Sequence, residues 1–415
     1  MGGYNPGSHA IQAHNAPTGA FFFDERSVSM EKRYVYLDHS ATTAIHPDVL
    51  EAMMPYLTDE YGNPNSLHRY GQRAQRAIEK ARRQVAAVLN CSPREIAFTG
   101  CGTESDNLAI RGVAFALRDK GRHIITTPIE HKAVLQTVKQ LEEHFGFEVT
   151  YLPVDEYGRV SVDDVARALR PDTILVSVMY ANNEIGTIQP IADIGALCRE
   201  RGVVFHTDAV QAGGYLPLDV DALNVDLMAL SGHKFHAPKG VGVLYVRRRT
   251  PWISMMTGGG QEHGMRSGTQ NVAGIVGLGA AIEIAHTDRE AKNARLRAMR
   301  DHLVGSILEQ VDDVQLTGHP TERLPGHASF VVSNVDADSL LLGLDLEGVA
   351  ASSGSACSSG AITPSHVLSA IGATKREAMS ALRLTLGDDN TEEEVAYAAE
   401  AVPRVIQRLR QYART

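Results

Sequence analysis

Three short and almost continuous apolar segments constrain the fold of this chain more than any other feature of its sequence. They cover residues 173–179, 203–207 and 227–231, and polar side chains gather where each segment ends. Apolar segments of this length that lack a polar face are typical of strands buried on both sides of a mostly parallel sheet. Ligands bind such sheets beyond the carboxyl ends of the strands, so the polar residues after each segment are candidate functional residues.

Helical periodicity alternates with strand-like segments along most of the chain. Apolar residues recur at helical spacing over 74–89, and further helices are predicted over 103–117 and from about His131. Three further strands are predicted, over 95–99, 123–127 and 241–246. The alternation predicts an α/β fold with helices on both faces of the sheet.

The domain organisation follows from a change of pattern after about residue 287. A long charged helix is predicted over 288–311, and shorter strands and helices lead to a last helix from Thr391. We predict three parts: a flexible N-terminal extension (1–33), a large domain (34–287) and a small α+β domain (288–415). The first ~15 residues of the large domain are expected to pack with the small one.

Charge and composition exclude several classes of function. The chain has 40 Lys and Arg residues against 49 Asp and Glu residues, and the formal charge of −9 argues against direct nucleic-acid binding. No apolar stretch approaches the ~18 residues of a membrane span. Residues 1–23 contain no Lys, Arg, Asp or Glu, which argues against a secretory signal and against an Arg-rich transit peptide.

The four cysteines do not form a disulfide or metal pattern. No C-x-x-C pair occurs, so neither a zinc ribbon nor a dithiol redox site is predicted, and no metal site is expected. Scarce cysteines favour a reducing, cytoplasmic setting. Cys91 and Cys198 end apolar helices and are expected to be packing residues, whereas Cys357 lies among small residues, where an exposed and reactive thiol is expected.

Three polar clusters follow predicted strands, and each has an ordinary alternative. Lys234 ends the sequence Ser-Gly-His-Lys after segment 227–231, and could be a desolvated nucleophilic amine or a solvated loop lysine. Asp208 could pair with a buried cation or cap a helix. The turn at 100–104, Gly-Cys-Gly-Thr-Glu, could bind an anion at a helix N-terminus or be a tight turn. Together with Cys357, the set suggests pyridoxal 5'-phosphate (PLP), with its aldehyde on Lys234 and its pyridine nitrogen on Asp208.

Around these residues the sequence resembles the NifS/IscS-type cysteine desulfurases, a branch of the class V aminotransferase group of fold-type I PLP enzymes. The resemblance runs from Tyr36 to about Leu409 and rests on many short motifs in the order of the family. These include Leu-Asp-His-Ser-Ala-Thr-Thr (37–43), Gly-Asn-Pro (62–64), Glu-His-Lys-Ala (130–133), Ala-Asn-Asn-Glu-Ile-Gly-Thr (181–187), Ser-Gly-His-Lys (231–234), Arg-Ser-Gly-Thr (266–269) and Ser-Gly-Ser-Ala-Cys (353–357). It implies a mostly parallel seven-stranded sheet in the large domain.

The resemblance also implies roles for individual residues. Lys234 is expected to bind PLP as a Schiff base and then to move protons on the substrate. Asp208 would hold the pyridine nitrogen, and His131 would stack on the ring as a further catalytic residue. The remaining cofactor residues are Asn183 and Gln211 for the ring hydroxyl, and Gly102, Thr103, Ser231 and His233 for the phosphate. Thr269 is expected to reach the cofactor phosphate of the neighbouring subunit in a homodimer, and Arg383, with Asn183, would bind the substrate carboxylate.

The reaction implied by the resemblance is the removal of sulfur from L-cysteine. It gives L-alanine and a persulfide on Cys357, which is passed to an iron–sulfur scaffold or another sulfur-acceptor protein. Iron–sulfur cluster assembly and tRNA thiolation are the expected uses. A selenocysteine lyase, a class V aminotransferase and a catalytically idle sulfur carrier are the alternatives, and the presence of both Lys234 and Cys357 favours the desulfurase.

Two positions depart from the family pattern. Cys101 stands where glycine is usual in the phosphate turn, so the backbone conformation there is an open question. Asp388 stands where arginine is usual, which reverses a charge. The sequence leaves open the effect of both departures, the sulfur acceptor, the role of residues 1–33 and the preference between cysteine and selenocysteine.

Overall fold

The computed structural model describes residues 34–354 and 364–412. The predicted N-terminal extension and Cys357 lie outside the described residues. The large sheet has seven strands in the order β2-β8-β7-β6-β5-β3-β4, which confirms the predicted seven-stranded sheet. Its strands are β2 (Ile96–Thr99), β3 (His123–Thr126), β4 (Glu148–Tyr151), β5 (Thr173–Ser177), β6 (Val204–Asp208), β7 (Leu227–Ser231) and β8 (Gly242–Val246). Only β8 runs antiparallel to its neighbours in this sheet, so the sheet is mostly parallel.

The apolar segments of the sequence form the centre of this sheet. Every residue of β5, β6 and β7 is buried. Successive side chains of a strand point to opposite faces, and accordingly Phe205 and Met228 belong to one core while Val204 and Leu227 belong to another. The sheet therefore requires apolar helices on both sides.

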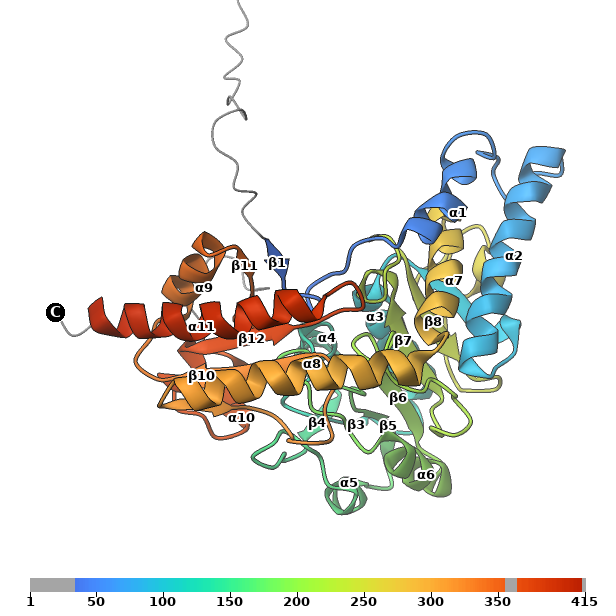
Figure 1. Cartoon of the computed structure of the whole chain (residues 1–415). Helices are drawn as coiled ribbons and strands as arrows, with labels where there is room; N and C mark the ends of the chain where they lie inside the picture. The colour runs from blue at the N-terminus through green and yellow to red at the C-terminus, as the bar shows by residue number, and fades with distance from the viewer. Residues whose placement is uncertain (1–33, 355–363, 413–415) are drawn as a thin grey trace, which may run out of the picture. The chain divides into compact units, whose positions relative to one another are not determined.

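Helices cover both faces of the sheet (Figure 1). The core on one face includes residues of α1 (Pro47–Leu57), α2 (Arg69–Leu89), α5 (Val162–Ala168), α6 (Ile191–Arg201) and α7 (Val272–His286). The core on the other face includes residues of α3 (Gly102–Leu117) and α4 (Lys132–Phe145). Except for α2, which begins five residues before the predicted periodicity over 74–89, these ends agree with the predicted helices and strands to within about two residues, which is the usual uncertainty of element boundaries.

A second, smaller sheet follows the long helix α8 (Arg289–Gln310). Its strands are β9 (Val314–Leu316), β10 (His327–Val332) and β12 (Ala381–Thr385), all antiparallel. Helices α8, α9 (Ala337–Leu346) and α11 (Glu392–Tyr412) complete its core. The remaining strands are β1 (Val35–Tyr36) and β11 (Val349–Ala350), which pair with each other, and the remaining α-helix is the short α10 (His366–Ala370).

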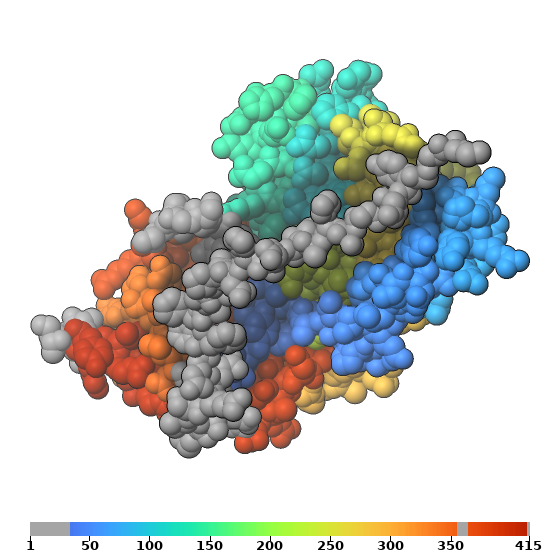
Figure 2. Space-filling model, turned by 90° about the horizontal axis from the view of Figure 1, so that it is seen from above, coloured from blue at the N-terminus to red at the C-terminus, as the bar shows by residue number. Residues whose placement is uncertain are grey.

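Val35 and Leu37 also belong to this second core, and the domain boundary near residue 287 stays a prediction. In both views α9 and the end of α11 lie on the opposite side of the described chain from α2 (Figures 1 and 2). Among residues 34–354 and 364–412, no helix combines the length and apolar character that are needed to cross a membrane.

Candidate active site

The candidate site lies where several strands of the large sheet end at the same edge. Asp208 is the last residue of β6 and Ser231 the last residue of β7. His131 is the N-cap of α4, which follows β3, and Gly102 begins α3, which follows β2. Parallel strands bring their carboxyl ends together, so residues far apart in the sequence meet here.

Lys234 enters the site through the short helical turn Gly232–Lys234 that follows β7. Its ammonium Nζ donates hydrogen bonds to the carbonyl oxygens of Ser40 (2.5 Å) and Ala41 (2.8 Å). Gln211 binds the same segment, because its side-chain amide donates a hydrogen bond to the carbonyl oxygen of Ser40 at 3.0 Å. Residues 40–41, which the motif Leu-Asp-His-Ser-Ala-Thr-Thr contributes, therefore hold the amine at the sheet edge.

Asp208 and His131 are polar residues that lie close together in the site. A carboxylate oxygen of Asp208 accepts a hydrogen bond from the backbone N–H of Val210 at 2.9 Å. Burial raises the pKa of Asp208, and His131 and Lys234 oppose that effect. Nδ1 of His131 accepts from the backbone N–H of Ala133 at 3.1 Å, so the ring proton of the neutral form is on Nε2. Burial lowers the pKa of His131, which keeps the ring neutral.

The first turn of α3 is built to receive an anion. Its N-cap residue, Cys101, makes no side-chain capping hydrogen bond, so the first N–H groups of the helix stay available. A Cβ on Gly102 would lie 2.6 Å from Cγ2 of Val210 and 3.3 Å from Cβ of Ser231, so only glycine fits there. Thr103 follows in this turn, and His233 lies two residues after Ser231, where burial lowers its pKa to about 4.

Cys101 itself is accommodated without backbone strain. Its φ of −176° and ψ of 173° are extended values that any residue adopts, and its side chain is exposed. The replacement of the usual glycine therefore requires no left-handed conformation. The second departure, Asp388, lies 3.9 Å from the ammonium of Lys292 on α8, which supplies a cation for the reversed charge.

Arg383 reaches the site from the small sheet. Its Nη2 donates to a carboxylate oxygen of Asp38 at 2.7 Å, and its Nη1 donates to the carbonyl oxygen of Asn183 at 2.9 Å. Its Nε is buried and has no hydrogen-bond partner within the described part of the chain. The side chain of the neighbouring Asn182 forms hydrogen bonds with backbone groups, including the carbonyl oxygen of Ile129. Asn183 is therefore the asparagine of the pair whose side chain is available for a ligand.

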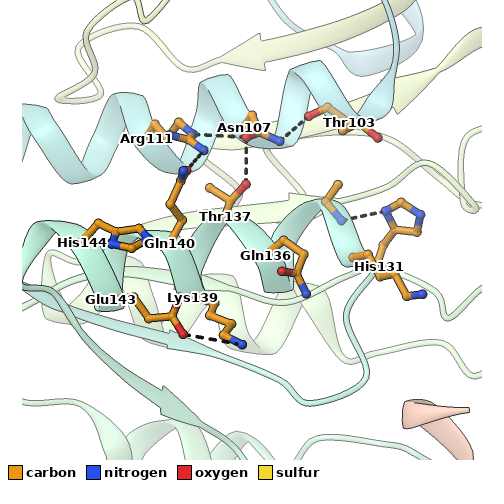
Figure 3. A pocket seen from close by; sticks show the side chains of 12 residues that line it. Thr103, Asn107, Arg111, His131, Gln136, Thr137, Lys139, Gln140, Glu143 and His144 are labelled. Atoms are coloured by element: carbon orange, nitrogen blue, oxygen red, sulfur yellow. Dashed lines mark hydrogen bonds and ion pairs between the residues drawn. The ribbon is translucent and has the colours of Figure 1, made fainter. Parts of the chain in front are cut away.

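A groove between α3 and α4 opens beside these residues. Thr103 and His131 lie at one end of it, and Arg111, Gln140 and His144 lie at the other (Figure 3). Thr269 is exposed, and within residues 34–354 and 364–412 it forms no hydrogen bond with the other candidate residues. Its predicted contact with a neighbouring subunit stays a prediction, as does the role of Cys357.

Sequence reasoning missed two acidic residues of the site. Asp38 belongs to the motif Leu-Asp-His-Ser-Ala-Thr-Thr (37–43), whose pattern indicates no catalytic role for it, and it forms the ion pair with Arg383. Asp106 has the position of an ordinary acidic residue near a helix N-terminus, yet its side chain is buried beside Asp208. An acidic residue among the apolar residues of a helix face is the signal that could have identified Asp106.

The residues present fit PLP. The uncapped first turn of α3 with Gly102 suits a phosphate, the ammonium of Lys234 suits an aldehyde, and the carboxylate of Asp208 suits a protonated pyridine nitrogen.

Comparison with known proteins decides the family. The model of the family "Aminotransferase class-V" matches residues 35–397. The chain belongs to the class-V aminotransferase family. Among curated class-V relatives, "Cysteine desulfurase IscS" of Methanosarcina thermophila is 50% identical over 384 residues, which cover 92% of this chain and 95% of that protein. The protein of the same name from Dictyoglomus turgidum is 49% identical over 379 residues, which cover 91% of this chain and 96% of that protein.

Solved structures of class-V proteins agree with this assignment. A NifS-like protein superposes with a TM-score of 0.85 at 40% identity, covering 91% of this chain and 100% of that one. The structure "SspA in complex with cysteine" superposes with a TM-score of 0.76 at 38% identity, covering 85% of this chain and 98% of that one. The predicted resemblance to NifS/IscS-type cysteine desulfurases is confirmed, and with it PLP as the cofactor of this family.

Proposed function

We propose that this protein is a cysteine desulfurase that binds PLP at Lys234 and carries the released sulfur on Cys357. The sulfur of L-cysteine leaves its Cβ, and the thiolate of Cys357 attacks that sulfur. A sulfur–sulfur bond forms on Cys357 as the carbon–sulfur bond breaks, and the protons of the thiol groups end on the Cβ of alanine and on the persulfide. L-cysteine and one thiol thus become L-alanine and one persulfide.

The observation that carries this proposal is the convergence of Lys234, Asp208 and the uncapped turn at Gly102 on one edge of the sheet. PLP, when bound, supplies an electron sink for the bond changes at the amino acid. Asp208 would hold its pyridine nitrogen, and the N–H groups at Gly102 and Thr103, with Ser231 and His233, would hold its phosphate. Asn183 and Gln211 would bind its ring hydroxyl.

The remaining side chains would bind the substrate and move its protons. The guanidinium of Arg383 would bind the carboxylate of L-cysteine, because its buried Nε has no partner among the described residues. The amine of Lys234 would take the α-proton of the substrate and return it during formation of alanine. His131 would lie against the cofactor ring with its proton on Nε2.

A homodimer is part of the proposal. Exposed large apolar residues are concentrated in one segment that includes α1 and the chain leading to α2. Seven of the 18 exposed large apolar residues of the described chain lie in residues 45–70: Ile45, Leu50, Met54, Leu57, Tyr61, Leu67 and Tyr70. An apolar surface of this kind is typical of a protein–protein interface. A second copy of the chain would cover it, and the exposed Thr269 would reach the cofactor phosphate of that copy.

The expected recipient of the sulfur is an iron–sulfur scaffold or another sulfur-acceptor protein, in the cytoplasm. A reducing compartment suits a thiol that cycles through a persulfide. Delivery of sulfur for tRNA thiolation would run through such a protein, because the chain has a net charge of −9 and no excess of basic residues.

The purified protein provides the test. We expect a yellow absorption band of lysine-bound PLP, and sulfide and alanine in equal amounts from L-cysteine with dithiothreitol. Lys234→Ala should abolish both the band and turnover. Cys357→Ala should keep the band and lose turnover. Cys91→Ala, which changes a partly buried cysteine after α2, is the matched control and should behave as the wild type. Sulfide release by Cys357→Ala at the wild-type rate would show that the persulfide assignment is wrong.

A further inference from the structure

Asp106 is a buried carboxyl group that the mechanism above does not use. It lies in α3, four residues after the Gly102 position that begins the helix, and its side chain is 1% exposed. Its Oδ1 makes no hydrogen bond within the described residues, and the Nε2 of His206 lies 3.5 Å from it. A buried carboxyl group without hydrogen bonds is costly, so a group of this kind calls for a functional explanation.

Asp106 faces the group that would hold the pyridine nitrogen. One carboxylate oxygen of Asp106, one of Asp208 and one ring nitrogen of His131 all lie within 4.8 Å of one another. Two ionised carboxylates at such a separation repel each other strongly when both are buried. One of the two therefore keeps a proton at neutral pH.

Within residues 34–354 and 364–412, no Lys or Arg side chain forms an ion pair with Asp106 that could compensate a second negative charge. The groups that face it from α3, β6 and the chain before α4 are Cys101, His206, Asp208, Glu130 and His131. Nδ1 of His206 is paired with the hydroxyl of Ser177 at 2.9 Å, and burial lowers the pKa of His206 to about 3, so its ring is neutral. Burial also raises the pKa of Glu130, to about 8.

Of the two carboxyl groups, Asp106 is the one that is expected to keep the proton. Burial raises the pKa of Asp106 well above its usual range, and Asp208, Glu130 and Cys101 act in the same direction. Asp208 accepts a hydrogen bond from the backbone N–H of Val210, and Lys234 also lowers its pKa, whereas no described residue lowers the pKa of Asp106 in this way. These partners favour the ionised form of Asp208.

We infer that Asp106 is a positioning residue that stays protonated, supports the carboxylate of Asp208 and leaves the pair with a single negative charge for the pyridine nitrogen. This inference rests on the proposed function, because Asp208 must be the partner of that nitrogen. One negative charge matches the one positive charge of a protonated pyridine. Asp106 thereby tunes the cofactor through Asp208 without touching it.

Two substitutions of similar size separate this role from a merely structural one. Asp106→Asn keeps a neutral polar side chain that can donate a hydrogen bond, whereas Asp106→Leu removes the polar atoms. In Asp106→Asn we expect the Kd for PLP to stay within about twofold of the wild-type value, and the loss of one buried polar contact in Asp106→Leu to raise it about tenfold. The absorption band of bound PLP changes with pH. The midpoint of that change should be the same in Asp106→Asn as in the wild type and shifted in Asp106→Leu.

The apoprotein gives a readout that does not depend on the cofactor. At pH 7 its infrared spectrum should contain the C=O band of a protonated carboxyl group that Asp106→Asn removes. Asp226→Asn is the matched control, since Asp226 is a half-buried carboxyl that accepts a hydrogen bond from the N–H of Phe205, beyond the opposite end of β7. This variant should keep both the band and the affinity for PLP.

The outcomes are distinct. The inference is overturned if Asp106→Asn weakens PLP binding as much as Asp106→Leu does, because Asp106 would then act as an anion. It is also overturned if the infrared band of Asp106 is absent, or if Asp106→Leu folds and binds PLP like the wild type. If Asp106→Leu does not fold, the asparagine variant and the infrared band still decide. Failure of the wild type to bind PLP would instead contradict the proposed function.

Discussion

Arg383 is held in place before any substrate is bound. Its two terminal nitrogens are fixed by the Asp38 carboxylate at 2.7 Å and the Asn183 carbonyl at 2.9 Å, and its side chain is 5% exposed. A guanidinium that is already oriented loses little conformational entropy when a carboxylate binds. At the scale of single residues, Asp38 is therefore a candidate for setting the affinity for L-cysteine.

Removal of this support should weaken substrate binding more than chemistry. For Asp38→Ala we expect the KM for L-cysteine to rise about fivefold, with a smaller change in kcat, because one charge-assisted hydrogen bond that orients Arg383 is lost. Asp38→Asn keeps an oxygen acceptor and should show a smaller rise. Steady-state kinetics check this, with Asp119→Ala on the exposed turn after α3 as control. A lower KM in Asp38→Ala would mean that Asp38 competes with the substrate for Arg383.

At the scale of elements, the apolar segments made the core of the fold predictable. The strand predicted over 227–231 has the same bounds in the structure, Lys234 follows it as expected, and Asp208 is the last residue of β6. The antiparallel direction of β8 (Gly242–Val246) could not be predicted, because a strand buried on both faces has the same apolar pattern in either direction.

The contacts across the site were not predictable from local pattern either. Asp38 and Arg383 are 345 positions apart in the sequence. Their ion pair depends on the packing of the small sheet against residues 38–41. Asp106 resembled the acidic residues that commonly occupy the first turn of a helix. Its burial follows from the placement of α3 over the sheet, which no spacing within the helix reveals.

A buried ion pair ties helix α2 to the loop that carries Arg266 and Thr269. Arg82 on α2 donates to both carboxylate oxygens of Glu262, at 2.7 and 3.0 Å, and the N–H of Phe98 donates to one of them at 2.8 Å. The side chains of Arg82 and Glu262 are 2% and 1% exposed. The pair thus fixes the start of the loop against β2.

Breaking one side of this pair should be strongly destabilising. Arg82→Met leaves a buried carboxylate without its partner, and we expect it to lower the free energy of unfolding by about 3–5 kcal/mol. The double variant Arg82→Met with Glu262→Met should recover much of that loss, because no unpaired charge remains. Urea denaturation of the three proteins measures both values. If the single variant is as stable as the wild type, the pair does not hold the loop.

At the scale of the whole molecule, buried neutral histidines couple stability to pH. His206 lies in the middle of the sheet, and burial lowers its pKa to about 3. Burial also lowers the pKa of His327 on β10 well below its usual range. The unfolded chain binds protons at these positions below about pH 6.5, but the folded chain does not. Each such histidine therefore contributes a loss of stability as the pH falls below that value. Glu130 acts in the opposite direction, since its pKa is raised to about 8.

His206→Asn isolates one of these contributions, because the variant and the wild type share every other titrating group. At pH 7.5 His206 is neutral in both the folded and the unfolded wild type. Its titration therefore contributes almost nothing at this pH to the difference in unfolding free energy between the wild type and the variant. At pH 5 the unfolded wild type is protonated at His206 and the folded one is not, which costs the wild type roughly 2 kcal/mol. Urea titrations of the PLP-loaded proteins measure the unfolding free energy of each. When the pH is lowered from 7.5 to 5, the unfolding free energy of His206→Asn minus that of the wild type should therefore rise by that amount. His302→Asn, on the exposed face of α8, is the control variant. A constant difference for His206→Asn would show that His206 takes up a proton in the folded protein.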